Sequence, residues 1–241
     1  MTAITPSRRE RLRTTTVAEL KAAARRQLVT GGPAAVSLRA IARDLGMTAP
    51  AIYRYFASLD ALIVALTVDF YAELRHTVEA ARDRHPPDQP LRRLGEMARG
   101  FRQWARQHPA EFALMFGSPV PGVTDFDRLS GPVQEAGARF GAAFLDAFGE
   151  LYARHRMPAP PAQLLDERFT ARLGPYAEAL GDRFPLPVVY VFLAGWTRLY
   201  GLVATEVFGH LQWAMTDAEP LFELELARIV DDLAGPPTAD P

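Results

Sequence analysis

Hydrophobic residues recur at intervals of three and four along most of the chain, and no run of alternating apolar and polar residues persists. The first pattern places apolar side chains on one face of an α-helix, whereas alternation indicates a strand. The sequence therefore predicts an all-α protein. Proline- and glycine-containing breaks separate expected helices at 14–31, 38–45, 49–55, 58–84, 91–107, 109–116, 129–155, 187–209 and 217–233, with shorter helical pieces over 161–182. The residues before Thr14 are expected to be frayed.

The segment 37–56 predicts two short helices joined by a tight turn. Ser37 is placed to cap the first helix, because its hydroxyl oxygen can accept hydrogen bonds from the free N–H groups of the first turn. Gly46 can adopt the left-handed backbone conformation that ends a helix, and Thr48 is placed to cap the second one. Pro50 fits the first turn of that second helix, because the N–H that it lacks would have no partner there.

The second of these helices is predicted to have one buried and one exposed face. Ile52 and Phe56 are four residues apart, so both are expected to turn inward. The outward-facing residues are then Thr48, Ala49, Pro50, Tyr53 and Arg54. This arrangement is a helix-turn-helix, whose second helix has the right size to enter a major groove of DNA.

The charge distribution supports an interface with a polyanion. Residues 1–60 carry ten basic and four acidic side chains, a net charge of +6, whereas the whole chain carries −1 and the remaining 181 residues therefore −7. A basic N-terminal segment on an acidic remainder is expected where one end of a protein contacts phosphates. The alternative for the charges alone is an ordinary solvated surface.

Five motifs of the first 65 or so residues occur in the order of one known family. They are Ala18–Gly31, Leu38–Ala42, Leu45–Thr48, Ala51–Phe56 and Ser58–Leu62. This segment resembles the TetR (tetracycline-repressor) family of bacterial transcription regulators. The resemblance implies an N-terminal three-helix DNA-binding domain, here 1–60, and a C-terminal helical-bundle domain for ligand binding and dimerisation, here 61–241. Leu59 departs from the family, which usually has a phosphate-contacting lysine at this position.

The resemblance also assigns DNA contacts. It implies phosphate contacts for Ser37, Arg39, Thr48 and Tyr53 and base-edge contacts for Ala49, Pro50 and Arg54. Among the base-facing residues only Arg54 is a long hydrogen-bond donor, so it is the candidate for contacting guanine O6 and N7. Tyr53 and Tyr55 have an alternative role, packing between the third helix and the first.

Two later stretches resemble the WHG subgroup of the same family. They are His108–Gly117 and Trp196–Gly201, and Tyr200 replaces the usual histidine of the second. Regulators of this family usually enclose an apolar effector cavity among their central helices, oriented by a few polar groups. The expected lining residues are Trp104, Phe116, Phe140, Trp196 and Tyr200, for each of which ordinary core packing is the alternative. Arg198 is a candidate anion partner, or else forms a buried ion pair or an interface contact.

The two C-terminal helices, 187–209 and 217–233, are the candidate homodimer interface. The last helix has apolar residues on more than one face, which suits burial against its own chain and against a second copy. These residues are Leu221, Phe222, Leu224, Leu226, Ile229, Val230 and Leu233. The resemblance implies a four-helix interface, and a two-fold dimer matches a palindromic operator.

Other function classes find little support in the sequence. The five histidines show no metal-ligand spacing, and there is no cysteine, glycine-rich phosphate loop or G-x-S-x-G motif. We therefore expect no catalytic residue, metal or cofactor. The segment 186–208 is long enough to cross a bilayer, but the charge of Arg198 near its centre favours a helix buried between protein neighbours. No signal-peptide pattern begins the chain, which favours a cytoplasmic bacterial protein.

These observations together predict a homodimeric transcription regulator. We expect a repressor that binds a palindromic double-stranded DNA operator and is released by a small apolar or amphipathic effector. The alternative is a helical small-molecule-binding module without DNA-binding activity, which the missing lysine at Leu59 favours slightly. An all-α enzyme is the weaker rival.

Overall fold

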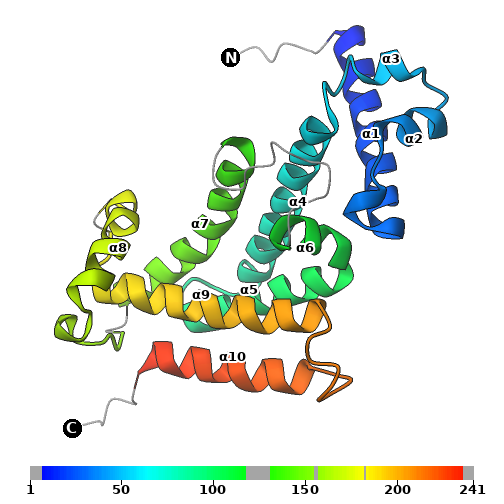
Figure 1. The fold of residues 1–241 in the computed structure, drawn as a ribbon. Coiled ribbons are helices and arrows are strands. Elements are labelled where there is room, and N and C mark those ends of the chain that lie inside the picture. Colours follow the sequence, from blue (N-terminus) through cyan, green and yellow to red (C-terminus); the bar gives the residue numbers. More distant parts are fainter. Residues whose placement is uncertain (1–6, 118–130, 155–156, 182, 236–241) are drawn as a thin grey trace. The chain divides into compact units, whose positions relative to one another are not determined.

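The structure is a computed structural model that describes residues 7–117, 131–154, 157–181 and 183–235. Every regular element within those ranges is helical, which confirms the all-α prediction (Figure 1). The α-helices are α1 (Arg8–Gly31), α2 (Leu38–Asp44), α3 (Ala49–Ile52), α4 (Leu59–Arg82), α5 (Pro90–Gln107), α6 (Pro109–Phe116), α7 (Gly131–Arg154), α8 (Glu167–Ala179), α9 (Leu186–Val207) and α10 (Glu219–Ala234). Two short 3₁₀ turns, Pro33–Ala35 and Ala162–Leu164, complete the list.

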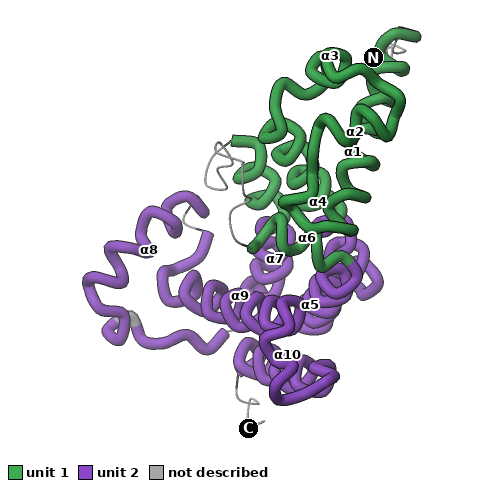
Figure 2. Tube along the Cα trace, turned by 45° about the vertical axis from the view of Figure 1, so that its right-hand side comes forward, with its two compact units in different colours: residues 1–73, 108–140 green, residues 74–107, 141–241 purple. Residues whose placement is uncertain are grey.

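The chain divides into two compact units (Figure 2). The first unit comprises residues 1–73 and 108–140, and the second comprises 74–107 and 141–241. Both units therefore draw on separate stretches of the sequence, and α4 and α7 contribute residues to each. The predicted boundary at residue 60 divides the chain into two consecutive segments, whereas the compact units combine separate segments. The predicted boundary stays a prediction.

The core of the first unit forms where the apolar faces of its helices meet. Leu20 and Leu28 of α1, Ile41 of α2 and Ile52 of α3 are completely buried. Ile63 of α4 is equally inaccessible. Burying a side chain of this size stabilises a fold by about 1.5–3 kcal/mol, so these residues hold the three N-terminal α-helices against α4.

α1 begins six residues earlier than the sequence analysis predicted. A capping box starts it: the Glu10 N–H donates to Ser7 Oγ at 3.2 Å, and the Ser7 N–H donates to Glu10 Oε2 at 2.6 Å. The expectation that the residues before Thr14 are frayed is therefore wrong for residues 8–13. The reciprocal Ser-x-x-Glu pattern is a helix start signal that the hydrophobic periodicity alone did not reveal, because this part of the helix has no apolar face.

The helix-turn-helix follows the prediction at most positions. The Ala40 N–H donates to Ser37 Oγ at 3.4 Å, so Ser37 caps α2, and Gly46 has a φ of 64° in the turn. Thr48 occupies the position before α3 but makes no capping hydrogen bond with its side chain, contrary to the prediction. The α-helical part of α3 ends at Ile52, and the expected residues 53–55 continue as turns.

The second unit is a helical bundle built from α5, α8, α9, α10 and the remainders of α4 and α7. Gly100 lets α4 and α5 approach closely, because a Cβ at this position would lie 3.2 Å from the Ala81 Cβ. The predicted shorter helical pieces over 161–182 are the 3₁₀ turn Ala162–Leu164 and α8. The start of α8 is capped by Asp166, whose Oδ1 accepts from the Phe169 N–H at 2.6 Å.

α9 is the one helix, among the residues that the structure describes, with the length and apolar composition to cross a membrane. Only 22% of its most apolar window is buried inside the chain. α10 lies beside α9 (Figure 1). Most α9 residues are half-buried, and Tyr190 is 38% exposed.

Candidate nucleic-acid interface and apolar pocket

The helix-turn-helix presents the outer face that its sequence predicts. Ile52 is completely buried, and Phe56 is 7% exposed, so both turn inward. The exposed residues of this element include all of the predicted outward positions, Thr48, Ala49, Pro50, Tyr53 and Arg54. Tyr53 is 48% exposed, which contradicts the alternative that it packs between helices. Its hydroxyl is therefore accessible to a ligand such as a phosphate.

Two other predicted DNA contacts lie at the start of α2. The Ser37 N–H donates to Gln27 Oε1 at 3.0 Å, and the half-buried Ser37 side chain caps α2. Ser37 therefore ties α2 to α1, and its phosphate contact stays a prediction. Arg39 is exposed and forms no ion pair with a described residue.

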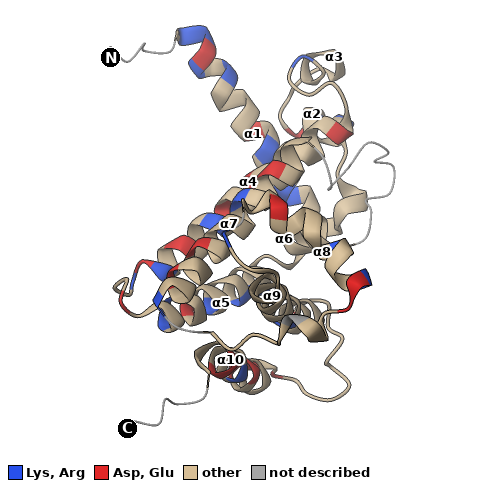
Figure 3. Cartoon of the chain, turned by 90° about the vertical axis from the view of Figure 1, so that its left-hand side faces the viewer, with Lys and Arg blue, Asp and Glu red and all other residues tan. Residues whose placement is uncertain are grey.

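A basic groove lies next to Arg54 and was not predicted. Its lining residues are Arg8, Arg9, Leu12 and Arg13 of α1 and Arg54 and Tyr55 from the end of the helix-turn-helix. The ribbon of α1 is coloured blue for basic residues at this end in Figure 3. The Arg13 guanidinium lies 5.4 Å from the centroid of the Tyr55 ring, so Tyr55 packs against α1 as its alternative role required. The sequence signal was present in the run of arginines, but only the early start of α1 places it here.

The inner half of α1 uses its basic residues differently. Lys21 Nζ lies 2.8 Å from Asp69 Oδ2, and Arg25 bridges Glu73 of α4 at 2.7 Å and Glu111 of α6 at 2.8 Å. Burial disfavours a charged Arg25, but its hydrogen bonds to the two glutamates outweigh that cost and raise the pKa of Arg25. These pairs join α1 to the rest of the first unit and neutralise the charges of Lys21 and Arg25.

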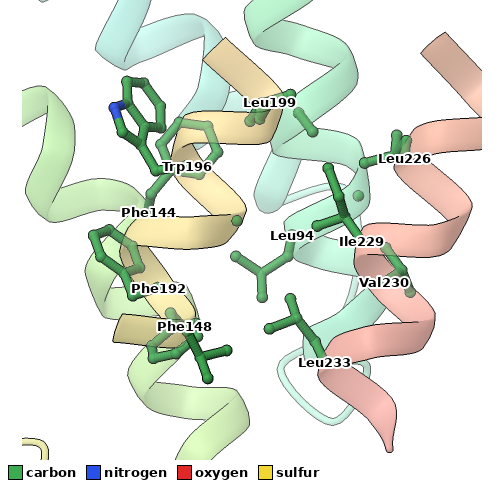
Figure 4. A pocket seen from close by; sticks show the side chains of 14 residues that line it. Leu94, Phe144, Phe148, Phe192, Trp196, Leu199, Leu226, Ile229, Val230 and Leu233 are labelled. Carbon is green, nitrogen blue, oxygen red and sulfur yellow. The ribbon is translucent and has the colours of Figure 1, made fainter. Parts of the chain in front are cut away.

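An apolar pocket lies in the second unit, between α5, α7, α9 and α10 (Figure 4). It encloses about 60 Å³ that the centre of a water molecule can occupy. Its lining residues are Leu94, Gly95, Ala98, Phe144, Phe148, Val191, Phe192, Gly195, Trp196, Leu199, Leu226, Ile229, Val230 and Leu233. The indole of Trp196 carries the only polar side-chain group in this set, so the pocket offers contact to hydrocarbon and almost no hydrogen bonding.

The predicted ligand-lining residues lie in different places. Trp196 lines the pocket, and the Tyr200 ring stacks on it with centroids 6.3 Å apart, although Tyr200 is not itself a lining residue. Trp104 is buried in α5 of the second unit. Phe116 and Phe140 belong to the first unit, where their ring centroids lie 5.7 and 6.2 Å from that of Tyr71. A ligand role for these five residues stays a prediction.

Arginines of α5 are paired with carboxylates of α9 and α10. Arg102 makes a bidentate contact with Glu206, at 2.7 and 2.8 Å, and both side chains are largely buried. The Arg99 Nη2–Glu223 Oε2 distance is 2.6 Å, and this hydrogen bond lowers the pKa of Glu223. Arg198 of α9 forms an ion pair with Asp232 of α10. This pair is partly exposed, so it is not the buried ion pair that was one of the predicted alternatives, and the roles of Arg198 as an anion partner or an interface contact stay predictions.

Metal chemistry finds no site in the part of the chain that the structure describes. No group of three histidine, aspartate or glutamate side chains there is arranged to hold a metal ion. His108 Nδ1 lies 3.7 Å from Glu111 Oε1. Arg25 already pairs with that carboxylate.

Comparison with known proteins agrees with this architecture. Residues 20–66 match the family model of bacterial regulatory proteins of the tetR family. Residues 94–229, more than half of the chain, match the model of the tetracyclin repressor-like C-terminal domain. The chain belongs to the TetR family. The matched C-terminal region includes both stretches that resemble the WHG subgroup, and assignment to that subgroup rests on those stretches alone.

Several relatives are similar over most of their length. The HTH-type transcriptional regulators Rv1816 of Mycobacterium tuberculosis and Mb1846 of Mycobacterium bovis are each 36% identical over 87% of this chain and 88% of their own. The crystal structure of regulatory protein SCO4313 has a TM-score of 0.73 at 32% identity and covers 93% of this chain and 98% of that one. PfmR, a TetR family transcriptional regulator from Thermus thermophilus, shares the fold at a TM-score of 0.50 and 15% identity, over 88% of this chain and 96% of its own. This TetR-family protein is a DNA-binding transcription regulator with a helix-turn-helix.

Proposed function

We propose that this regulator is a homodimeric, cytoplasmic repressor that binds a palindromic operator and is released by a small, neutral, apolar effector. Residues 1–60 would bind DNA, and residues 61–241 would bind the effector and the second copy. The observation that carries the proposal is the exposed outer face of the helix-turn-helix, where Arg54, two residues after α3, has no acidic partner among the described residues.

Operator recognition would use the exposed face of the helix-turn-helix. Arg54 can donate two hydrogen bonds to O6 and N7 of one guanine, and Ala49 and Pro50 can contact only apolar groups such as a thymine methyl. Thr48, Tyr53 and Arg39 are exposed and carry donors for backbone phosphates. Ser37 lies at the N-terminal end of α2, which its hydroxyl caps, and from there it would contact a phosphate.

Dimerisation would use α9 and α10. One face of α10 is buried in its own chain through Phe222, Leu226, Ile229 and Leu233. Leu224 on another face is 54% exposed, and Tyr190 of α9 is 38% exposed. Apolar groups on the open sides of two adjacent helices support a four-helix interface with a second copy, and such a two-fold dimer matches the symmetry of a palindrome.

The effector class follows from the apolar pocket. A charged ligand would have to leave water without a compensating partner among the fourteen lining residues, which is costly, so we propose a neutral, hydrocarbon-rich effector. The enclosed space of about 60 Å³ is small, and a larger effector must displace side chains such as Phe192 or Trp196. Release from DNA then requires that the effector bind the released form more tightly than the DNA-bound form.

DNase footprinting of the full chain on its own upstream region tests operator binding. We expect a protected near-palindrome with half-site centres about 34–36 Å apart, and an affinity that falls as salt rises. Light scattering on the same sample should give twice the mass of the chain. Purified protein that ignores duplexes even at low salt would contradict the repressor and favour the small-molecule-binding module.

A matched pair of probes tests the effector class. Toluene should raise the melting temperature of the protein, whereas benzoate, which adds a carboxylate to a similar ring, should leave it unchanged. Neutral compounds that pass this screen are then tested for weakening of the footprint. Stabilisation by benzoate but not by toluene would contradict a neutral apolar effector.

A further inference from the structure

We propose that the first two turns of α1 form a second DNA contact, which binds the backbone phosphates flanking the half-site under α3. The surface is the basic groove already described, with Arg8, Arg9 and Arg13 on one side and Arg54 on the other. This inference rests on the proposed operator binding and adds a contact outside the helix-turn-helix.

The groove combines four cationic side chains with no carboxylate in its lining. About 520 Å³ within it can be occupied by the centre of a water molecule, so it is open enough for a phosphate. None of its four arginines forms an ion pair with a described residue, although Lys21 and Arg25 further along α1 do. Unpaired guanidinium groups that converge on one groove favour a multivalent anionic partner.

Glu10 is the only acidic residue in the first two turns of α1, and it does not neutralise the groove. Its carboxylate accepts a hydrogen bond from the Ser7 N–H in the capping box, which lowers the pKa of Glu10 and holds its oxygens at the helix end. The capping box also keeps residues 8–13 helical. The arginines are therefore presented at fixed spacing on a helix instead of on a loose tail.

The outer half of α1 contributes no buried side chain to the core of the first unit. The first buried residue of the helix is Leu20, and Leu12 is 60% exposed among the arginines. At 1.5 Å per residue, the twelve residues before Leu20 form an arm about 18 Å long. An arm of that length laid along a duplex spans about five base pairs.

Arg13 links this arm to the DNA-contacting element. Its guanidinium lies over the Tyr55 ring at 5.4 Å, and Tyr55 follows Arg54 directly. The contact holds the first turns of α1 beside the end of the helix-turn-helix, so that phosphates adjacent to a base bound by Arg54 fall within the groove. Arg13 is thus a positioning residue, whereas Arg8 and Arg9 carry the free charge.

The test compares salt dependence in the full-length protein, using the operator found by footprinting. The double variant Arg8→Gln/Arg9→Gln removes two charges from each protomer and keeps residues of similar helix propensity. Each phosphate contact contributes about 0.9 to the slope of log affinity against log salt, so the slope should become shallower by about 3 to 4 for a dimer. Trimming the duplex by about five base pairs on each flank should make the salt slope of the wild type shallower by a similar amount. The salt slope of the variant should not change on trimming.

The matched control is Arg84→Gln/Arg92→Gln, which removes the same charge from exposed arginines of the second unit. It should keep the wild-type slope. If the groove variant also keeps the wild-type slope on an operator that the protein does bind, this inference is wrong and the proposed function stands. If the wild-type protein binds no duplex, both this inference and the proposed function are wrong.

A membrane is the other polyanion that such a groove fits. Wild type and the groove variant should bind vesicles of phosphatidylcholine with 30% phosphatidylserine equally weakly. If the variant loses vesicle binding and keeps its salt slope on DNA, the groove is a membrane contact and the inference is overturned.

Discussion

The two units of this protein use arginine in opposite ways. Around α1 and α3 of the first unit, Arg8, Arg9, Arg13 and Arg54 converge on an open groove without acidic partners. Along α5 of the second unit, Arg99 and Arg102 are paired with glutamates of α9 and α10. In these two clusters, the same side chain is left available to a partner in the first unit and stabilises helix packing in the second, whereas Arg25 shows that the first unit contains paired arginines as well. A count of basic residues cannot separate these two roles, because it ignores where the carboxylates lie.

The open spaces of the two units differ in the same sense. The groove of the first unit is lined by arginines, whereas the pocket of the second unit is lined almost entirely by hydrocarbon. The groove suits a polyanion that stays hydrated, and the pocket suits a ligand that leaves water. Each of the following changes tests one side of this contrast, beginning with the largest expected effect.

Replacing a paired arginine should destabilise the fold without a direct effect on DNA. In Arg102→Met, the largely buried Glu206 loses its bidentate partner and keeps Arg106, whose Nε lies 3.2 Å from Glu206 Oε1. Breaking a buried pair costs about 3–5 kcal/mol, and the remaining Arg106 places the expected cost at the lower end, about 3 kcal/mol. Urea unfolding should show a lower midpoint. A variant as stable as wild type would mean that the α5 pairs are as dispensable as surface charges.

Replacing an unpaired arginine should have the converse effect. Arg54→Met should leave the free energy of unfolding within about 0.5 kcal/mol of wild type, because the exposed side chain has no acidic partner. Its loss from a guanine contact should weaken operator binding by about 2 kcal/mol, or roughly 30-fold, and relax discrimination at one base pair. Competition with duplexes substituted at each position measures both effects. Full discrimination in the variant would exclude Arg54 as the base contact.

Filling the apolar pocket should separate stability from ligand binding within the second unit. A Cβ at Gly195 would lie 4.0 Å from Ile229 Cγ2, an ordinary contact, so Gly195→Ala fits the pocket wall. Replacing a glycine inside a helix should stabilise the fold by about 0.5–1 kcal/mol. The added methyl group takes part of the small enclosed space, so the toluene-induced rise in melting temperature should shrink. An undiminished rise would place the probe elsewhere.

The smallest expected effect is a pH dependence from the paired carboxylates. The hydrogen bond from Arg99 lowers the pKa of Glu223 below its usual value of 4.5. Glu223 therefore contributes stability that is fully present above pH 4.5 and is lost as the pH falls through its lowered folded pKa. Because the pair is partly exposed, the contribution is below about 1 kcal/mol. Glu223→Gln should reduce the loss of stability on acidification in urea titrations, and an identical pH profile would contradict this role.

Local rules predicted much of the helix-turn-helix. The spacing of Ile52 and Phe56, the position of Ser37 and the glycine at 46 each act within a few residues, and the structure confirms them. The same rules failed at Thr48, whose side chain makes no capping bond, and before Thr14, where apolar periodicity is absent although a capping box is present. Periodicity reports helices that bury a face, so it misses a helix that extends into solvent.

The candidate sites also differ in how far local sequence could predict them. The outward positions of α3 could be assigned from sequence because a helix of known phase fixes which side chains point away from the core. The apolar pocket could not, since its walls come from four helices that are far apart in the chain. Of the aromatic residues expected to line a cavity, Trp196 lies in its wall, while Phe116 and Phe140 belong to the other unit.

By itself, the sequence determined the helical class, the helix-turn-helix with its outer face, and the family to which the chain belongs, because these depend on periodicity, caps and short motifs. Tertiary structure alone decided which arginines are neutralised, where α1 meets Tyr55, and which helices enclose the apolar pocket. Charge pairing and cavities depend on distances between residues remote in sequence. Such distances are set only when the helices pack.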